Sequence, residues 1–339
     1  MKKTLAALLP VALLASSLAA CSGGASSGAA AGTSVKTGLA VITAIDSSKD
    51  AGDADGLAQV DSTVVAVTVG ADGKLAKVAI DSVQTKIAIG KDGKIATPLD
   101  TVVESKDELG EGYGMKGKSG LGKEWNEQAQ AFADYAVGKT VADLKGIALD
   151  EEGHATDTDV TASTTISVGD FIDAIEKAAS NAQDLGAKAD DKLGLGIVTN
   201  IASSKDAGDK DGVAQAYSEY SVITLGADGK ITSAITDASQ TNVNFSKEGK
   251  ITTDLASAFK TKDELGADYG MKGQSGIGKE WNEQAKGFSD YIKGKTPDEV
   301  KGIAVDEEGH PTASDLTSST TIGIVDFQEA VQKAASTAK

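Results

Sequence analysis

Early in the chain, short apolar runs alternate with residues that form tight turns. Residues 64–69 and 75–83 are rich in β-branched side chains and flank the segment 70–73, which ends in an Asp-Gly pair. This arrangement predicts a β-hairpin. Residues 87–89 and Ile95 flank a second Asp-Gly turn and predict a second hairpin.

Further along, the spacing of apolar residues changes from the period of a strand to that of a helix. Two sets of residues each share one helical face. They are Trp125, Ala129, Phe132 and Ala136 in the first set, and Val168, Phe171, Ile172 and Ile175 in the second. A meandering antiparallel sheet followed by helices is an α+β arrangement, and we expect that fold class.

The whole pattern occurs twice. Residues 38–180 align with residues 194–336 without a gap. Each copy has the length of an ordinary domain and exceeds the period of solenoid repeats, so the alignment predicts two tandem domains with independent cores. We expect the domains to span residues 37–181 and 193–339, with a polar linker at 182–192 that does not fix one domain against the other.

The N-terminus predicts export and anchoring. Two lysines precede an apolar run that ends in Leu18-Ala19-Ala20-Cys21, which is typical of a signal peptide over residues 1–20 with a lipobox cysteine. We expect Cys21 to become the lipid-modified first residue of a protein on the extracellular face of the cytoplasmic membrane. An ordinary signal peptide with an incidental cysteine is the alternative. Residues 21–36 are mostly Gly, Ala and Ser and predict a flexible tether.

Composition excludes several classes of function. The formal charge of −17 argues against nucleic-acid binding, which requires clustered cations. Cys21 is the only cysteine, which excludes an internal disulfide framework and thiolate metal sites. All 33 basic residues are lysines, so a bound phosphate would lack the bidentate grip of arginine. A nucleotide would therefore need backbone amides, lysines or a covalent attachment.

A Ser/Thr-rich segment precedes the last helix of each copy. It runs from Asp159 to Ile166 and again from Asp315 to Ile322, with Ser167 or Gly323 near the N-cap position. A helix start offers unpaired N–H groups and a partial positive charge, which favour a phosphate on a nearby hydroxyl. Helix capping by Ser and Thr is the alternative interpretation.

This segment resembles the flavin-attachment motif of FMN-binding domains in subunits of sodium-translocating NADH:quinone reductase and related complexes. In that family the motif is Asp, two residues, Ser, Gly, Ala, Thr, and a flavin transferase joins FMN to the final threonine. The resemblance matches Asp159 and Asp315 to the aspartate, and Ser163, Ser319, Thr164 and Thr320 to the glycine and alanine. It implies covalent FMN on Thr165 and Thr321, with Thr164 and Thr320 as the alternative register.

A second resemblance lies upstream. Ser119-Gly120-Leu121-Gly122 and Ser275-Gly276-Ile277-Gly278 are similar to a Pro-Gly-Leu-Gly loop that flanks the flavin in the same domains. Glycine permits close approach of the backbone. Flat aromatic and thioether side chains suit an isoalloxazine ring. The candidates are Tyr113, Met115 and Trp125, with Tyr269, Met271 and Trp281; core packing is the alternative for the tryptophans.

Other chemistry is less favoured by the residues. His154 and His310 each lie near Ser and Asp in sequence but lack a nucleophile elbow, which disfavours a hydrolase. One histidine per copy also disfavours zinc. The acidic loops 50–56 and 206–212 partly resemble a calcium loop, but lack its glutamate at the twelfth position, and solvated turns are favoured.

The resemblance implies an electron carrier related to surface flavolipoproteins of Gram-positive extracellular electron transfer. Its expected partners are a flavin transferase, a membrane quinone or an NADH dehydrogenase-linked donor, and extracellular acceptors such as ferric iron. Because the two motifs are nearly identical, we expect similar potentials and parallel carriers. A non-redox ligand-binding or adhesion lipoprotein is the alternative.

Overall fold

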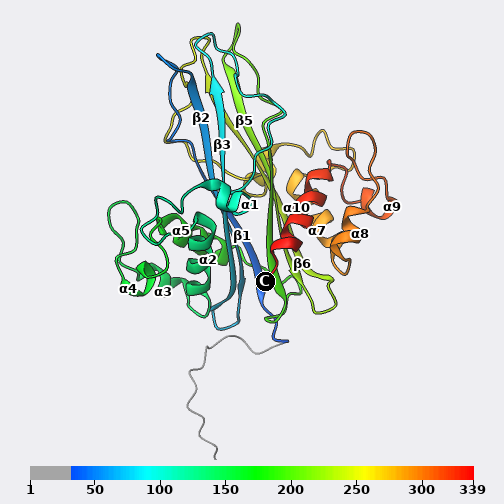
Figure 1. The fold of residues 1–339 in the computed structure, drawn as a ribbon. Helices are drawn as coiled ribbons and strands as arrows, with labels where there is room; N and C mark the ends of the chain where they lie inside the picture. The colour runs from blue at the N-terminus through cyan, green and yellow to red at the C-terminus, as the bar shows by residue number, and fades with distance from the viewer. Residues whose placement is uncertain (1–31) are drawn as a thin grey trace, which may run out of the picture.

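The computed structural model describes residues 32–339 and consists of two similar units, in which helices follow a three-stranded antiparallel sheet (Figure 1). The predicted α+β class is confirmed. In the first sheet the strands lie in the order β1 (Lys36–Ala44), β2 (Gly56–Val69), β3 (Leu75–Ile89). The second sheet has the order β4 (Lys192–Asn200), β5 (Gly212–Leu225), β6 (Ile231–Phe245).

The helices occur at equivalent places in both units. The first unit contains α1 (Lys106–Leu109), the 3-10 helix η1 (Gly110–Tyr113), α2 (Trp125–Ala136), α3 (Val141–Lys145), α4 (Thr158–Thr161) and α5 (Gly169–Ser180). The second contains α6 (Lys262–Leu265), the 3-10 helix η2 (Gly266–Tyr269), α7 (Trp281–Ile292), α8 (Pro297–Lys301), α9 (Ser314–Thr317) and α10 (Val325–Thr337). The two predicted amphipathic helices correspond to α2 and α5.

The predicted first hairpin is confirmed, and it is longer than expected. β2 and β3 pair up to Val69 and Leu75, and the turn between them includes Gly73 at φ 77°, a left-handed conformation that glycine adopts without strain. The second predicted hairpin is only a tight turn, because β3 continues unbroken to Ile89 and Ile95 returns to it in a single bridge. β1 was not predicted; its glycine and alanines weaken the β-signal.

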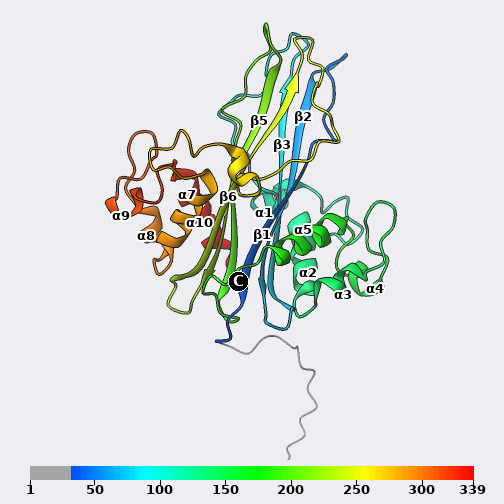
Figure 2. The same cartoon turned by 180° about the vertical axis from the view of Figure 1, so that it is seen from behind.

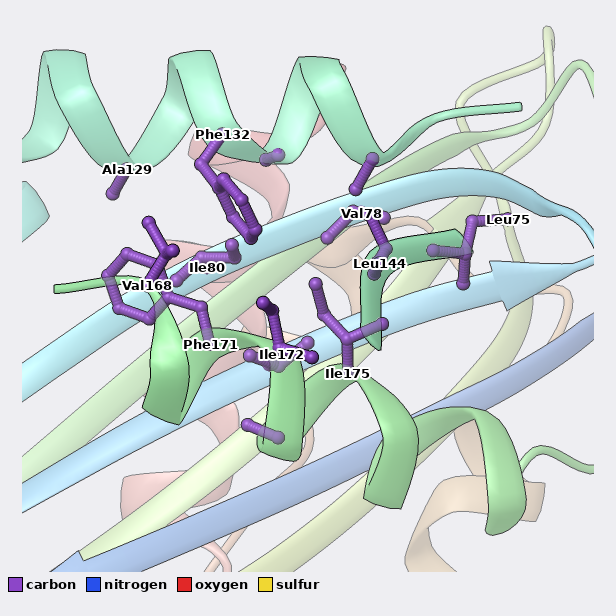
Figure 3. Close-up of a cluster of buried hydrophobic side chains, with 14 of the residues drawn as sticks. Leu75, Val78, Ile80, Ala129, Phe132, Leu144, Val168, Phe171, Ile172 and Ile175 are labelled. Carbon is purple, nitrogen blue, oxygen red and sulfur yellow. The ribbon is translucent and has the colours of Figure 1, made fainter. Parts of the chain in front are cut away.

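Each unit has a core between its sheet and its helices. In the first unit, Phe132 of α2 and Phe171 of α5 pack together with ring centroids 6.0 Å apart, in one buried cluster with the sheet residues Val78 and Ile80 (Figure 3). An equivalent cluster contains Phe288 of α7 and Phe327 of α10 in the second unit. These clusters bury the apolar faces from which the helices were predicted.

The opposite faces of the two sheets pack against each other. Helices α2–α5 lie on one flank and α7–α10 on the other, with all the strands between them (Figures 1 and 2). Two buried clusters combine residues of both sheets, such as Val64 and Val41 with Tyr220 and Leu195 in one, and Ile87 with Phe245 in the other. The prediction of two independent cores is therefore wrong, because part of the core is shared.

The linker and the acidic loops also join the two units. The backbones of Thr37 and Gln183 exchange two hydrogen bonds of 2.8 and 2.9 Å, and Ala187 is fully buried, so the linker is packed against the first unit. Asp50 accepts a hydrogen bond from the amide of Ile251 at 2.8 Å, and Asp206 accepts one from Ile95 at 2.9 Å. Each acidic loop thus contacts the other unit, and the linker does not leave the units free.

Strand glycines allow the last helix of each unit to approach its sheet. A Cβ atom added to Gly194 in β4 would lie 1.9 Å from the carbonyl oxygen of Ala334 in α10. We expect Gly194→Val to lower the free energy of unfolding by about 3 kcal/mol or more, because either the helix or the strand must move. Chemical denaturation measures this loss. Gly208→Val is the control, since a Cβ there meets no atom within 4 Å, and an equal loss in both variants would contradict the explanation.

Within residues 32–339, no helix is both long and apolar enough to cross a membrane. The predicted signal peptide, most of the predicted tether and the anchor residue Cys21 lie outside the described residues.

Candidate functional site

Each unit contains a cavity where the outer face of its sheet meets the N-terminal ends of its two long helices. Its volume is about 720 Å³ in the first unit and 700 Å³ in the second, a size typical of cofactor and ligand pockets. The wall of the first cavity includes Trp125 of α2, Tyr113 of η1, Met115 and Gly120. The equivalent positions in the second cavity are those of Trp281, Tyr269, Met271 and Gly276. The cavities bring together the aromatic, thioether and glycine residues that were selected from the sequence.

The paired threonines of the motif have different environments. Thr165 and Thr321 line the cavities. Thr164 and Thr320 are buried, and their hydroxyls donate hydrogen bonds of 2.9 and 2.8 Å to backbone carbonyls of α2 and α7. The hydroxyls of Thr165 and Thr321 also donate hydrogen bonds, to the side chains of Gln128 and Gln284, but these two threonines are not buried and line the cavities. The second threonine of each pair is therefore the one that a ligand in the cavity can contact.

The buried side chain of Gln128 forms hydrogen bonds both to Thr165 and to Ser119, which begins the loop 119–122. The side-chain oxygen of Gln128 accepts hydrogen bonds from the backbone amide and the hydroxyl of Thr165, at 2.7 and 3.1 Å. Its amide nitrogen donates to Ser119 Oγ at 3.1 Å and contacts the Met115 sulfur at 3.6 Å. Gln284 repeats these contacts in the second unit. This residue was missed in the sequence, although it belongs to the repeated block 123–129.

A buried glutamate fixes the loop that carries the methionine. The carboxylate of Glu124 accepts hydrogen bonds from the amides of Met115 and Lys116, at 2.8 and 3.0 Å. Glu280 accepts the equivalent bond from Met271 at 2.8 Å. Charge-assisted bonds of this kind are stronger than neutral ones, so the loop backbone is preorganised beside the cavity.

A lysine from the short first helix lies on the aromatic wall. Lys106 Nζ is 4.9 Å from the ring centroid of Trp125 and 5.1 Å from that of Tyr113. Lys262 lies 4.9 Å from both equivalent rings in the second unit. Both lysines line their cavities, so a cation–π contact keeps one positive charge inside each. The lysines were not predicted as site residues.

The tryptophans belong to the core as well as to the cavity. The ring of Trp125 meets Phe171 edge to face at 5.9 Å and is 4% exposed. Core packing therefore accounts for most of this side chain, as the alternative interpretation expected, while one edge of the ring remains part of the cavity wall. A rigid aromatic surface results.

Other predicted residues lie outside the cavity lining. They are Asp159, Asp315, Ser163, Ser319, Leu121, Ile277, Gly122 and Gly278. Gly122 and Gly278 instead adopt φ 62° and 64° in the turns that close the loops. At the start of α5, two backbone N–H groups are already hydrogen-bonded within the protein. The amides of Val168 and Gly169 both donate to the carbonyl of Gly153. The N-cap residue is Val168 and not Ser167.

The histidines lie at the edges of the cavities with acidic neighbours. His154 Nδ1 is 3.2 Å from Asp150 Oδ2, and His310 Nδ1 is 3.5 Å from Asp306 Oδ2. In the described part of the chain, neither imidazole is hydrogen-bonded to a serine hydroxyl, and no three His, Cys, Asp or Glu side chains converge on a metal position. The geometry gives no support to a hydrolase or to a calcium or zinc site.

No protein-family model, curated protein or solved structure matches this chain.

Proposed function

We propose that the protein is a surface-anchored electron carrier with two covalent FMN groups, attached through phosphoesters to Thr165 and Thr321. The observation that carries the proposal is the same in both units. A threonine lines a cavity with aromatic and thioether walls, while the hydroxyl of the preceding threonine is buried. The attachment motif and the cofactor-sized cavity thus occur together twice.

The residues of the cavities fit FMN. The Thr165 hydroxyl supplies the attachment point, and Lys106 supplies a cation in a chain that has no arginine. Trp125, Tyr113 and Met115 offer flat or polarizable surface for a ring system. FMN supplies reversible one- and two-electron redox chemistry. The protein's part is to attach, orient and surround the cofactor.

The predicted partners follow from this role. The lipid anchor at Cys21 would keep the carrier at the membrane, where a quinone or an NADH dehydrogenase-linked donor supplies electrons. Extracellular acceptors such as ferric iron would take them up. A flavin transferase is needed for loading. The net charge of −17 is consistent with the absence of nucleic acid among these partners.

Cells with the double variant Thr165→Val, Thr321→Val should display normal amounts of the protein but lose its contribution to ferric iron reduction. The rate should fall to that of cells without the protein, because both attachment points are gone. The fold should survive, since the change removes hydroxyls and costs about 1 kcal/mol at each site. A double variant that reduces iron at the parental rate would contradict the carrier role and favour a non-redox ligand-binding or adhesion module.

Anchoring is tested separately. Cys21→Ala should release the protein from membranes or leave the signal peptide uncleaved, because the acylated thiol is lost. Membrane fractionation and mass spectrometry of the N-terminal peptide measure both outcomes. A variant that stays in the membrane fraction and carries lipid like the parent would show that the assignment of Cys21 is wrong.

A further inference from the structure

The two cavities differ in charge even though the folds repeat. Three lysines and one aspartate line the first cavity: Lys86, Lys106, Lys118 and Asp170. One lysine and three acids line the second: Lys262, Glu219, Glu308 and Asp326. The lining of the first cavity therefore has more cations than that of the second, although Glu308 has an equivalent in Glu152, which lies beside His154 in the first unit.

Three substitutions between equivalent positions account for most of this difference. Asn242 replaces Lys86 and Gln274 replaces Lys118, so two cations disappear. Glu219 replaces Thr63 and adds an acid. One change has the opposite sign, because Tyr217 replaces Asp61, whose carboxylate accepts hydrogen bonds from the side-chain amides of Gln59 and of Gln84, a residue of the first cavity lining.

Glu219 is the most unusual of these residues. Its Oε1 accepts a hydrogen bond from the Tyr217 hydroxyl at 3.0 Å, and its Oε2 is buried with no hydrogen-bond partner in the described structure. Lys262 donates to the same Tyr217 hydroxyl at 2.9 Å. Burial, assisted by the nearby Asp326, raises the pKa of Glu219 to about 8. Even where Glu219 is protonated, the second cavity lacks the two lysines, so it remains the less cationic one.

Charge next to a redox cofactor sets how easily the cofactor is reduced. Reduced FMN carries more negative charge than oxidised FMN at neutral pH, so nearby cations stabilise the reduced state and nearby anions destabilise it. Solvent and salt weaken the effect of exposed lysines such as Lys86 and Lys118 but do not change its sign. The two sheets share buried clusters, and each cavity has its own set of charged residues.

We propose that the two sites are inequivalent, with the cofactor of the first unit at a higher midpoint potential than that of the second, so that electrons collect in the first unit. This inference rests on the proposed function. It replaces the sequence-based expectation of similar potentials, which relied on the attachment motifs alone. The charges that distinguish the sites are Lys86 on β3, Glu219 on β5 and Lys118 just before Ser119, all outside those motifs.

Single-flavin proteins test the proposal. Thr321→Val keeps only the first site and Thr165→Val only the second, and spectroelectrochemical titration at pH 7 gives the potential of each. We expect the more positive midpoint in Thr321→Val. Adding Lys118→Gln to that protein should lower its potential, and adding Gln274→Lys to the Thr165→Val protein should raise it. Both side chains are exposed, so folding should be unaffected.

Lys94→Gln is the matched control, because it removes an exposed lysine outside the cavity lining and should leave both potentials unchanged. Equal potentials or the reverse order in the two single-flavin proteins would overturn the inference while leaving covalent attachment intact. Equal shifts from Lys94→Gln and Lys118→Gln would also overturn it. Single variants without any flavin would overturn both this inference and the proposed function.

Discussion

Protein that carries Thr165→Val should contain one FMN per chain when it is produced with an active flavin transferase, and the double variant with Thr321→Val should contain none. Valine keeps the shape of threonine but has no hydroxyl with which to form a phosphoester. Each unit has its own cavity with its own threonine in the lining, so the two losses should be independent. Intact-mass measurement and the flavin absorbance of denatured protein give the content directly.

Thr164→Val and Thr320→Val are the matched controls, because they remove the neighbouring hydroxyls. These are buried and donate to the carbonyls of Gln128 and Gln284, which would lose that hydrogen bond. We expect full flavin content and a loss of about 1–3 kcal/mol in unfolding free energy. Loss of FMN in these controls, with retention in Thr165→Val, would assign the other register.

Tyr220→Ala should lower the free energy of unfolding by about 3–5 kcal/mol, the cost of deleting a large buried ring. Tyr220 is fully buried between the two sheets, and its hydroxyl lies 2.7 Å from Ser239 Oγ. Because the cluster contains residues of both sheets, both units should unfold at lower denaturant concentration. Denaturation followed separately in each unit through its flavin measures this.

Tyr220→Phe is the control for the hydroxyl alone and should cost about 1 kcal/mol. If Tyr220→Ala destabilised only the second unit, the two sheets would not form a shared core. That outcome would restore the interpretation of two independent domains.

The elements with local signals could be predicted from the sequence. The hairpin between β2 and β3 has β-branched runs around an Asp-Gly turn, and α2 and α5 have regular apolar faces. β1 was missed because Gly38 and two alanines weaken its β-pattern. That glycine is present because a Cβ there would lie 2.0 Å from the carbonyl of Ala178, a contact that only the tertiary structure reveals.

The sequence contains an indication that the sheet is covered on both faces. Residues 64–67 are continuously apolar, and in the structure Val64 and Ala66 face the other sheet while Val65 and Val67 face the helices. A strand buried on both faces has such a run, whereas a strand with one solvated face alternates. The pattern therefore indicated a second layer. It could not indicate that the second layer was the other repeat.

The residues of the candidate site that belong to the two sequence motifs, or lie close to them, could be predicted. Thr165, Met115 and Gly120 were selected from sequence and line one cavity. Gln128 and Glu124 were not, because their roles depend on hydrogen bonds to residues elsewhere in the fold. Their presence in both copies of the block 123–129 was the available signal, although repetition alone does not distinguish a site residue from a core residue.

Covalent flavin attachment is tested by the intact mass of the wild-type protein produced with an active flavin transferase, followed by peptide mapping. We expect a yellow protein heavier by two FMN groups, one on the peptide that contains Thr165 and one on the peptide that contains Thr321. Colourless protein of unmodified mass, obtained where the transferase modifies a known substrate, would show that the protein is not a covalent flavoprotein.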